Sequence, residues 1–324
     1  MAVKHERQRV YEYLRHKKKF PNMWCPGCGI GIVMGAIIRA IDRMRLEKDE
    51  VAVISGIGCT GRMPVYMDFN TMHTTHGRAL AFATGLKMVR PDMKVLVVMG
   101  DGDALAIGGN HFIHAARRNI DLTAIVVNNS VYGMTGGQYS PTTPTGSLAT
   151  TAPYGNIEQP FPICELAKAA GAALVARSTV YHALELDRLI ERAIRKKGFA
   201  VVEAVSYCHT SFGRLNKLGR APDMMRLLKE NSVTLQRAEK MSPEELKGKI
   251  VRGVLHEEDK PEYVELYDEI IRRAQEAARF SPPLYPFLSA RKKVVSLKRR
   301  FALSSQSFQL RASVATPKRE TTRK

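Results

Sequence analysis

One strand–helix–strand pattern constrains the fold of this chain more than any other feature. Two apolar segments rich in β-branched residues flank a helix-compatible segment, and each apolar segment leads into a short polar motif. In chain order these are Val95–Met99 with Gly100-Asp101-Gly102, the helical residues 106–118, and Leu122–Val127 with Asn128-Asn129. Ligands of an open parallel sheet bind beyond the carboxyl ends of its strands. The pattern therefore predicts that Asp101 and Asn129 meet at one edge of a parallel sheet.

These two strand ends carry oxygen ligands that suit Mg²⁺ better than zinc or iron. Glycines beside Asp101 would let the backbone approach a phosphate. Gly-Asp-Gly and Asn-Asn, with 25 residues between them, resemble the motif of thiamine diphosphate enzymes. By that resemblance the metal ligands are Asp101, Asn129 and the backbone carbonyl of Val131. The alternative is that both motifs are ordinary turns, in which Gly, Asp and Asn are common; their joint spacing favours the cofactor site.

Composition limits the class of protein. With 324 residues, 44% of them hydrophobic, the chain can bury a large core. No apolar stretch approaches the roughly 18 residues of a membrane span, and the basic N-terminus lacks the apolar core of a secretory signal. Five cysteines without a paired framework indicate a reducing compartment and predict a cytoplasmic location.

The positive charge is concentrated at the C-terminus. The net charge is +19, and residues 291–324 contain eleven Lys or Arg residues and one acidic residue, Glu320. We interpret residues 281–324 as a flexible, solvated basic tail. A nucleic-acid-binding function would depend on this tail alone, because no zinc-finger, helix-turn-helix or RNA-binding signature accompanies it.

Strands and helices alternate along the chain, which predicts an α/β fold with a parallel sheet flanked by helices. Residues 221–240 and 243–279 are charged and are predicted to be helical, and residues 135–160 form a loop whose length suggests a functional role. The other predicted elements are helices at 29–46, 77–90, 163–171 and 182–197 and strands at 51–55, 174–177 and 199–205.

The cysteines suggest a metal centre. Cys25-Pro-Gly-Cys28 is half of a site for tetrahedral zinc or for a [4Fe–4S] cluster, either of which needs two more ligands. Cys59 and Cys208 follow predicted strands at the edge that carries Asp101, whereas Cys164 lies among apolar residues and is predicted to be a core residue. A thioredoxin-like redox motif is the alternative for the first pair, but no βαβ unit leads into it.

A Gly-x-Gly-x-x-Gly motif at Gly56–Gly61 follows the strand at 51–55. It could indicate a dinucleotide-binding fold, but no acidic residue ends a second strand about 20 residues later, where a ribose contact would be. We therefore interpret it as a cofactor loop of another kind.

Several motifs occur together and in order: WCPGCG, GIGC, HTTHGR, GDGDALAIGGNH, NNSVYGMTGGQ with SPTTPTG, and SYC. Together they resemble the β subunits of 2-oxoacid:ferredoxin oxidoreductases, most of all the 2-oxoglutarate branch. The resemblance covers residues 20–215 and implies a thiamine diphosphate-binding fold. The resemblance fades in the helical segment and fails over the basic tail. Together with the composition of the two ends, it divides the chain into a basic lead-in at 1–22, a thiamine diphosphate- and cluster-binding domain at 23–215, a helical extension at 216–280 and the tail at 281–324.

The resemblance also implies the cofactors: thiamine diphosphate, Mg²⁺ and one [4Fe–4S] cluster. The implied cluster ligands are Cys25, Cys28, Cys59 and Cys208. The implied cofactor-binding residues are Ile57, Gly58, Cys59, Thr60, His76, Gly102, Asp103, Gly133 and Met134. His76 would place a donor near a phosphate or a substrate carboxylate, with a buried structural histidine as the alternative.

The implied reaction is the oxidative decarboxylation of 2-oxoglutarate to succinyl-CoA and CO₂, or its reverse, with electrons passed to ferredoxin. Coenzyme A and the 2-oxoacid would be the substrates. The glutamate that activates the thiamine would come from an α subunit, and further small subunits would be possible partners. Arg62, three residues after Cys59, is a candidate for binding the distal carboxylate; a surface arginine is the alternative.

Other enzyme classes stay open at this point. A pyruvate-specific or broad-specificity 2-oxoacid oxidoreductase is one alternative. A non-redox thiamine-dependent decarboxylase or synthase would not need four cysteines near the cofactor.

Overall fold

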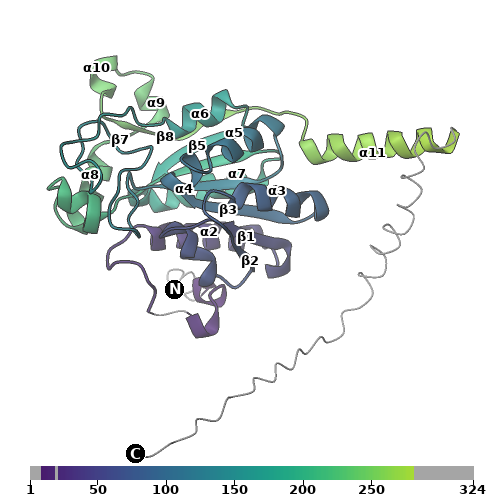
Figure 1. The fold of residues 1–324 in the computed structure, drawn as a ribbon, viewed down its shortest axis with the longest axis horizontal. Helices are drawn as coiled ribbons and strands as arrows, with labels where there is room; N and C mark the ends of the chain where they lie inside the picture. Colours follow the sequence, from purple (N-terminus) through teal and green to yellow (C-terminus); the bar gives the residue numbers. More distant parts are fainter. Residues whose placement is uncertain (1–8, 19–20, 281–324) are drawn as a thin grey trace, which may run out of the picture. The chain divides into compact units, whose positions relative to one another are not determined.

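A computed structural model describes residues 9–18 and 21–280 of the chain, which contain an eight-stranded sheet (Figure 1). The strand order is β2-β1-β3-β4-β6-β5-β8-β7, and all neighbours are parallel except β5 and β8. The strands are β1 (Val51–Ser55), β2 (Asn70–His73), β3 (Lys94–Gly100), β4 (Thr123–Asn128), β5 (Leu174–Thr179), β6 (Ala200–Val205), β7 (Ser232–Thr234) and β8 (Ile250–Glu257).

Helices connect most of the strands, as expected for a parallel sheet. The α-helices are α2 (Ile30–Met44), α3 (Ala79–Val89), α4 (Asp101–Leu105), α5 (Gly109–Arg118), α6 (Ile163–Ala169), α7 (Ala183–Arg195), α8 (Ala221–Glu230), α9 (Leu235–Ala238), α10 (Pro243–Leu246) and α11 (Tyr263–Phe280). The short helices are η1 (His16–Lys18), η2 (Lys48–Glu50), η3 (Thr60–Val65), η4 (Val180–His182) and the π-helix η5 (His209–Gly213).

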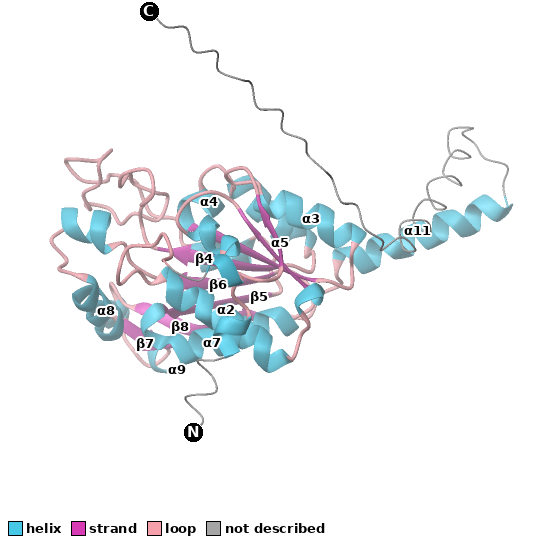
Figure 2. Ribbon diagram, turned by 90° about the horizontal axis from the view of Figure 1, so that it is seen from below, coloured by secondary structure: helices cyan, strands magenta, loops and turns pink. Residues whose placement is uncertain are grey.

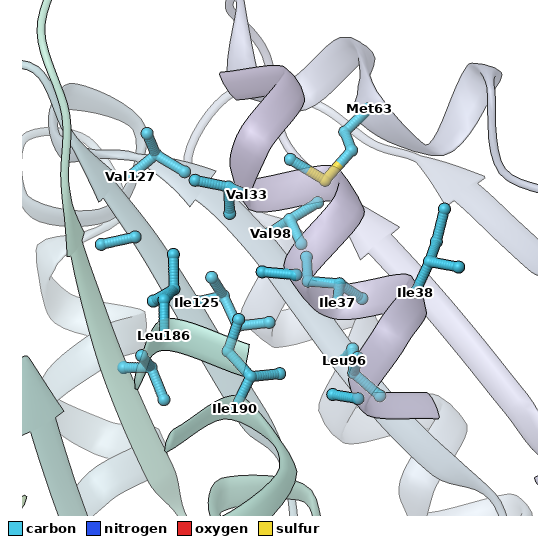
Figure 3. Close-up of a cluster of buried hydrophobic side chains, with 14 of the residues drawn as sticks. Val33, Ile37, Ile38, Met63, Leu96, Val98, Ile125, Val127, Leu186 and Ile190 are labelled. Atoms are coloured by element: carbon cyan, nitrogen blue, oxygen red, sulfur yellow. The ribbon is translucent and has the colours of Figure 1, made fainter. Parts of the chain in front are cut away.

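The central strands are buried on both faces, which explains their continuous apolar sequences. Leu96 and Val98 of β3 point into one core cluster, and Val95 and Val97 point into the other. Helices α2 and α7 cover the first face and helices α3 and α5 the second (Figure 2). On the first face, side chains of α2 such as Val33 and Ile37 pack with those of β3, β4 and α7 (Figure 3).

The predicted α/β fold is confirmed, and its parallel strands and flanking helices lie close to the predicted positions. One local difference matters for the site. A helix was expected from residue 106, but α4 begins directly after β3 at Asp101 and is separated from α5 by a turn. A Cβ atom at Gly108 would lie 2.3 Å from the Asp103 carbonyl oxygen, so the turn requires glycine there.

The prediction that residues 216–280 form a helical extension is wrong for two segments. Strand β8 pairs antiparallel with β5, and the short β7 pairs with β8. The β-branched residues Ile250, Val251 and Val254 are only half-buried, as in an outer strand of a sheet. The many charges around them suggested a solvated helix, whereas the edge of β5 offered backbone groups that needed partners.

The described part of the predicted basic lead-in packs against the body of the protein. Leu14 is buried and forms a β-bridge with Met67, and the ring of Tyr13 stacks on Phe69. The predicted basic tail at 281–324 lies outside the described residues. Among the helices of the described part, none is long and apolar enough to cross a membrane.

Candidate functional site

Loops from four neighbouring strands meet at the carboxyl edge of the sheet. β2 and β3 lie on opposite sides of β1, so the order of the strands reverses at β1, and such a reversal is where open α/β sheets bind ligands. The loop after β1 carries Cys59, β3 leads into Asp101, β4 leads into Asn129, and β6 is followed by Cys208. Two cavities lie among these loops.

The first, which we call the cofactor cavity, has a volume of about 150 Å³. All nine predicted cofactor-binding residues and the three predicted magnesium ligands line it, whereas Tyr132 and Thr135 were not predicted. Its lining residues are Ile57, Gly58, Cys59, Thr60, His76, Gly100, Asp101, Gly102, Asp103, Asn129, Val131, Tyr132, Gly133, Met134 and Thr135. Both missed residues lie inside the motif NNSVYGMTGGQ, next to Gly133 and Met134, which were predicted. This proximity in the sequence could have indicated that they line the same cavity.

Asp101 is almost completely buried and its two carboxylate oxygens have different neighbours. Oδ2 accepts hydrogen bonds from the hydroxyls of Ser140 and Thr142, the latter at 2.6 Å. One terminal atom of the Asn129 amide lies 3.2 Å from Oδ1 and 2.9 Å from the Val131 carbonyl oxygen.

In the structure that terminal atom is the amide oxygen, so three oxygen atoms face one another; in the opposite orientation the amide nitrogen would donate to both neighbours. Burial raises the pKa of Asp101, and hydrogen bonds from Ser140, Thr142 and the backbone act in the opposite direction. Three converging oxygens and a buried carboxylate are a donor set that fits Mg²⁺.

Asp103 lies two residues after Asp101, but its Oδ1 is surrounded by hydrogen-bond donors, whereas Oδ1 of Asp101 faces one end of the Asn129 amide. Its Oδ1 accepts from the backbone N–H of Gly77 at 2.7 Å and of Ile57 at 3.2 Å, and it lies 2.6 Å from His76 Nδ1. The carboxylate thus favours a proton on Nδ1 and leaves Nε2 of His76 for a ligand. A Cβ atom on Gly56 would lie 2.1 Å from the Asp103 carboxylate, so this close approach requires glycine.

Tyr132 packs against the loop that carries Asp101. Its hydroxyl donates to the Gly102 carbonyl oxygen at 3.1 Å, and a Cβ atom on Gly102 would lie 2.3 Å from its ring. Burial and the nearby charges of Asp101 and Asp103 raise the pKa of Tyr132 to about 12. Tyr132 is therefore a neutral donor that closes one wall of the cavity.

The second cavity, which we call the cysteine cavity, has a volume of about 290 Å³. Its lining residues are Met23, Trp24, Cys25, Cys28, Ile30, Cys59, Asn129, Gly133, Met134, Tyr207, Cys208, His209 and Thr210. It thus collects the four cysteines that the resemblance implies as cluster ligands. Four residues, Cys59, Asn129, Gly133 and Met134, line both cavities, so the two sites share a wall.

Short contacts hold this wall together. A Cβ atom on Gly133 would lie 3.4 Å from Cys208 Sγ and 3.6 Å from Cys59 Sγ, so the backbone at Gly133 lies directly against both sulfurs. The indole N–H of Trp24 donates to the Cys59 carbonyl oxygen at 2.8 Å, which ties the Cys-x-x-Cys segment to the loop after β1. Thr210, another residue that the sequence did not single out, places its hydroxyl 3.7 Å from Cys25 Sγ and 3.6 Å from Cys208 Sγ.

In the cysteine cavity, burial and the neighbouring cysteines disfavour the charged thiolate form of Cys28 and Cys59. Burial, together with the charges of the other three cysteines, raises the pKa of the Cys28 thiol to about 11. Burial and the charges of Cys208 and Cys25 also raise the pKa of Cys59. A bound cationic metal centre would offset this repulsion and stabilise the thiolates.

In the described part of the chain, no three His, Cys, Asp or Glu side chains converge as a single metal ion would require. A four-iron cluster binds one cysteine at each iron, so its sulfur ligands lie farther apart than those of one ion. Four cysteine thiols around one cavity are the kind of donor that a [4Fe–4S] cluster binds.

Two predicted residues lie outside both linings. Cys164 is buried and its thiol donates to Glu203 Oε2 at 3.2 Å, which confirms it as a core residue. Arg62 is partly exposed, and its Nε lies 3.3 Å from the Met23 sulfur, so its role toward a substrate stays a prediction. The Gly56–Gly61 motif leads into the 3-10 helix η3 rather than an α-helix, which argues against dinucleotide binding.

Comparisons with known proteins agree with this geometry. Residues 56–204 match the family model of the thiamine pyrophosphate enzyme, C-terminal TPP binding domain. The chain is 52% identical over 262 residues to the 2-oxoglutarate synthase subunit KorB of Methanocaldococcus jannaschii, covering 81% of this chain and 97% of that subunit. It is 50% identical over 259 residues to the subunit KorB of Archaeoglobus fulgidus, covering 80% and 93%.

A solved structure is similar over most of the chain. It is the 2-oxoglutarate:ferredoxin oxidoreductase from Magnetococcus marinus with 2-oxoglutarate, coenzyme A and succinyl-CoA bound. The similarity has a TM-score of 0.75 and a sequence identity of 32%, and it covers 89% of this chain and 95% of that one.

Proposed function

This chain belongs to the family of 2-oxoglutarate:ferredoxin oxidoreductase β subunits, also called 2-oxoglutarate synthase subunits, and we propose that it is the subunit that binds thiamine diphosphate beside a [4Fe–4S] cluster. The enzyme would interconvert 2-oxoglutarate with succinyl-CoA and CO₂. One observation carries the proposal: the cofactor cavity and the cysteine cavity share the wall formed by Cys59, Asn129, Gly133 and Met134. A non-redox thiamine enzyme has no need of that arrangement.

Thiamine diphosphate, when bound, supplies the nucleophilic carbon and the electron sink for decarboxylation. The residues of this chain would bind and orient it. Asp101 Oδ1, the Asn129 amide oxygen and the Val131 carbonyl oxygen would hold Mg²⁺ against the diphosphate. His76, oriented by Asp103, would direct Nε2 at a diphosphate oxygen or at the substrate.

A [4Fe–4S] cluster, when bound, would supply one-electron transfer toward ferredoxin. Cys25, Cys28, Cys59 and Cys208 would be its ligands. Cys59 belongs to both cavities, so it would place the cluster directly beside the thiamine site. The Cβ position of Gly133 is within van der Waals contact of the Cys59 and Cys208 sulfurs, so this residue lies beside the cluster ligands.

The cofactor cavity supports the need for an α subunit. Asp101 and Asp103 are its two acidic lining residues within the described chain, and both are committed to contacts with this chain. Neither is a candidate for the glutamate that activates the thiamine, so a partner would supply that group. Ferredoxin would be the electron acceptor, and the five free cysteines support a reducing, cytoplasmic location.

The test is anaerobic purification of the chain together with its α subunit. Iron, sulfide and thiamine are measured, followed by coenzyme A-dependent dye reduction with 2-oxoglutarate and with pyruvate. We expect about four irons and one thiamine diphosphate per chain and a preference for 2-oxoglutarate. Absence of iron would overturn the cluster, and equal rates with pyruvate would favour the broad-specificity alternative.

A further inference from the structure

The loop between β4 and α6 returns to the sheet edge and contacts Asp101. We propose that its residues Ser140 and Thr142, here called the hydroxyl clamp, are positioning residues that fix the Asp101 carboxylate for the metal. They would also couple metal binding to the order of the loop at 135–160. This inference rests on the proposed function, because it assumes that Asp101 binds Mg²⁺.

The clamp acts on one oxygen only. Ser140 and Thr142 are both buried, and both hydroxyls donate to Asp101 Oδ2. Oδ1 is thus left facing the Asn129 amide and the Val131 carbonyl oxygen. Two donors on the same oxygen restrict rotation of the carboxylate, so the metal would meet a ligand that is already oriented.

A chain of buried polar groups holds the clamp in place. Thr142 Oγ1 lies 3.0 Å from Asn128 Oδ1 at the end of β4, and the amide nitrogen of Asn128 donates to Glu203 Oε1 at 2.8 Å. Glu203, on β6, also accepts from Arg177 Nε of β5 at 2.7 Å. The position of the clamp is therefore set by three neighbouring strands, β4, β6 and β5.

The base of the loop depends on similar contacts. The Ser140 backbone N–H donates to Thr143 Oγ1 at 2.8 Å, that hydroxyl donates to the Ser130 carbonyl oxygen at 2.7 Å, and Asn156 Nδ2 donates to the Thr143 carbonyl oxygen at 2.8 Å. By contrast, Tyr154 in the outer part of the loop is fully exposed. Because binding couplings are reciprocal, a metal that fixes Asp101 should also order the base of the loop.

The test uses the complete complex, stripped of Mg²⁺ and thiamine diphosphate, and its readout is affinity rather than turnover. Mg²⁺ is titrated by calorimetry in saturating thiamine diphosphate. Thr142→Val and Ser140→Ala each remove one donor, Thr142→Ser keeps it, and Thr145→Val is the matched control. Thr145 lies in the same loop and donates to the Glu158 carbonyl oxygen instead.

We expect Thr142→Val and Ser140→Ala to weaken Mg²⁺ binding by about tenfold or more, within the range for residues that orient metal ligands. Thr142→Ser and Thr145→Val should bind like the wild type, and all variants should keep their iron. Wild-type affinity in both donor-removing variants would overturn the clamp. A wild-type complex that binds thiamine diphosphate without Mg²⁺ would instead overturn the proposed function on which the clamp rests.

The coupling to the loop is measured separately by hydrogen–deuterium exchange. Mg²⁺ with thiamine diphosphate should slow exchange in peptides that cover residues 138–147 of the wild-type complex, and slow it less in Thr142→Val. Unchanged exchange in the wild type on cofactor binding would overturn the coupling. If Thr142→Val fails to assemble, the same comparison is made with Ser140→Ala.

Discussion

At the scale of single residues, neighbours decide what a side chain can do. Asp101 and Asp103 are both buried carboxylates in one short helix, yet their surroundings differ. Backbone N–H groups and His76 satisfy Oδ1 of Asp103, which binds three loops together. The Oδ1 of Asp101 instead faces one end of the Asn129 amide, which also lies against the Val131 carbonyl oxygen. The same residue type is thus structural at one position and a candidate metal ligand at the other.

Replacement of Asp101 by alanine should abolish binding of Mg²⁺ and thiamine diphosphate, because a charged ligand of the metal is lost. The fold should survive, since the site lies at the sheet edge. Thiamine content and Mg²⁺ affinity of the purified complex measure the effect, and iron content serves as a control. Asp92→Ala, at an exposed position, is the matched variant that should bind normally. A D101A complex with one thiamine diphosphate per chain would contradict the assignment.

Serine at Cys25, Cys28, Cys59 or Cys208 should remove or strongly reduce the iron-dependent visible absorption, because serine is a poor ligand for a cluster. Cys164→Ser should leave the absorption unchanged, since serine can still donate to Glu203. Iron analysis and visible spectra of the five variants make the comparison. An essential Cys164 together with a dispensable Cys208 would show that the ligand set is wrong.

Arg62 tests the choice of substrate. 2-Oxoglutarate has a second carboxylate whose burial without a partner is costly. Arg62→Gln should lower kcat/KM for 2-oxoglutarate by about ten- to a hundredfold, since charged hydrogen bonds contribute about 1.5–3 kcal/mol. Arg62→Lys should lose less, and pyruvate should be affected little. Equal losses on both substrates would assign Arg62 a structural role, in keeping with its contact to Met23.

At the scale of secondary-structure elements, local sequence patterns predicted the parallel sheet and the residues at its carboxyl edge. The apolar runs at β1, β3, β4 and β6 required burial on both faces, and their polar ends had to lie at one edge. The strand β8 was missed because its residues are only half-buried and its partner β5 precedes it by about seventy residues.

The clamp was missed for a related reason. Nothing local to Ser140 or Thr142 indicates a contact with Asp101, which the fold alone creates.

The packing of α2 against α7 includes a buried ion pair, Arg39 with Asp187, at 2.7 and 2.9 Å. Arg39→Met should leave the buried carboxylate without its main partner and destabilise the protein by about 2 kcal/mol. This is less than the 3–5 kcal/mol of a fully buried pair because Arg39 is partly exposed.

Thermal unfolding measures the effect of this substitution. The double variant R39M/D187L, which replaces both charged residues by apolar ones, should recover most of the loss, because no unpaired charge remains. Arg90→Met, which breaks the exposed pair with Asp92, is the control and should change little. A single R39M variant as stable as the wild type would contradict the role assigned to this pair.

At the scale of the whole molecule, the described chain builds two adjoining cavities but supplies only part of a catalytic site. The proposed function assigns the cofactor cavity ligands for a metal and a diphosphate and assigns the acid that activates the thiamine to a partner. The cysteine cavity lies beside it and is lined by Met23 and Thr210 as well as by the four cysteines. If the proposed function holds, the shared wall at Cys59 would make this chain the connection between the carbon chemistry and the electron acceptor, and an α subunit would complete the site.

The basic segment at 281–324 should be separable from this machinery. The M. jannaschii subunit is matched over 97% of its length by 81% of this chain, so that relative needs fewer residues than this chain has. A complex whose β chain ends after Phe280 should keep its iron, thiamine and turnover with 2-oxoglutarate. Binding to nonspecific DNA at low salt should weaken, because most of the excess positive charge is removed. The measurements are turnover and the affinity for nonspecific DNA at several salt concentrations, each compared between the truncated and the full-length complex. Loss of turnover would show that the segment serves the enzyme, and undiminished DNA binding would locate that affinity in the folded body instead.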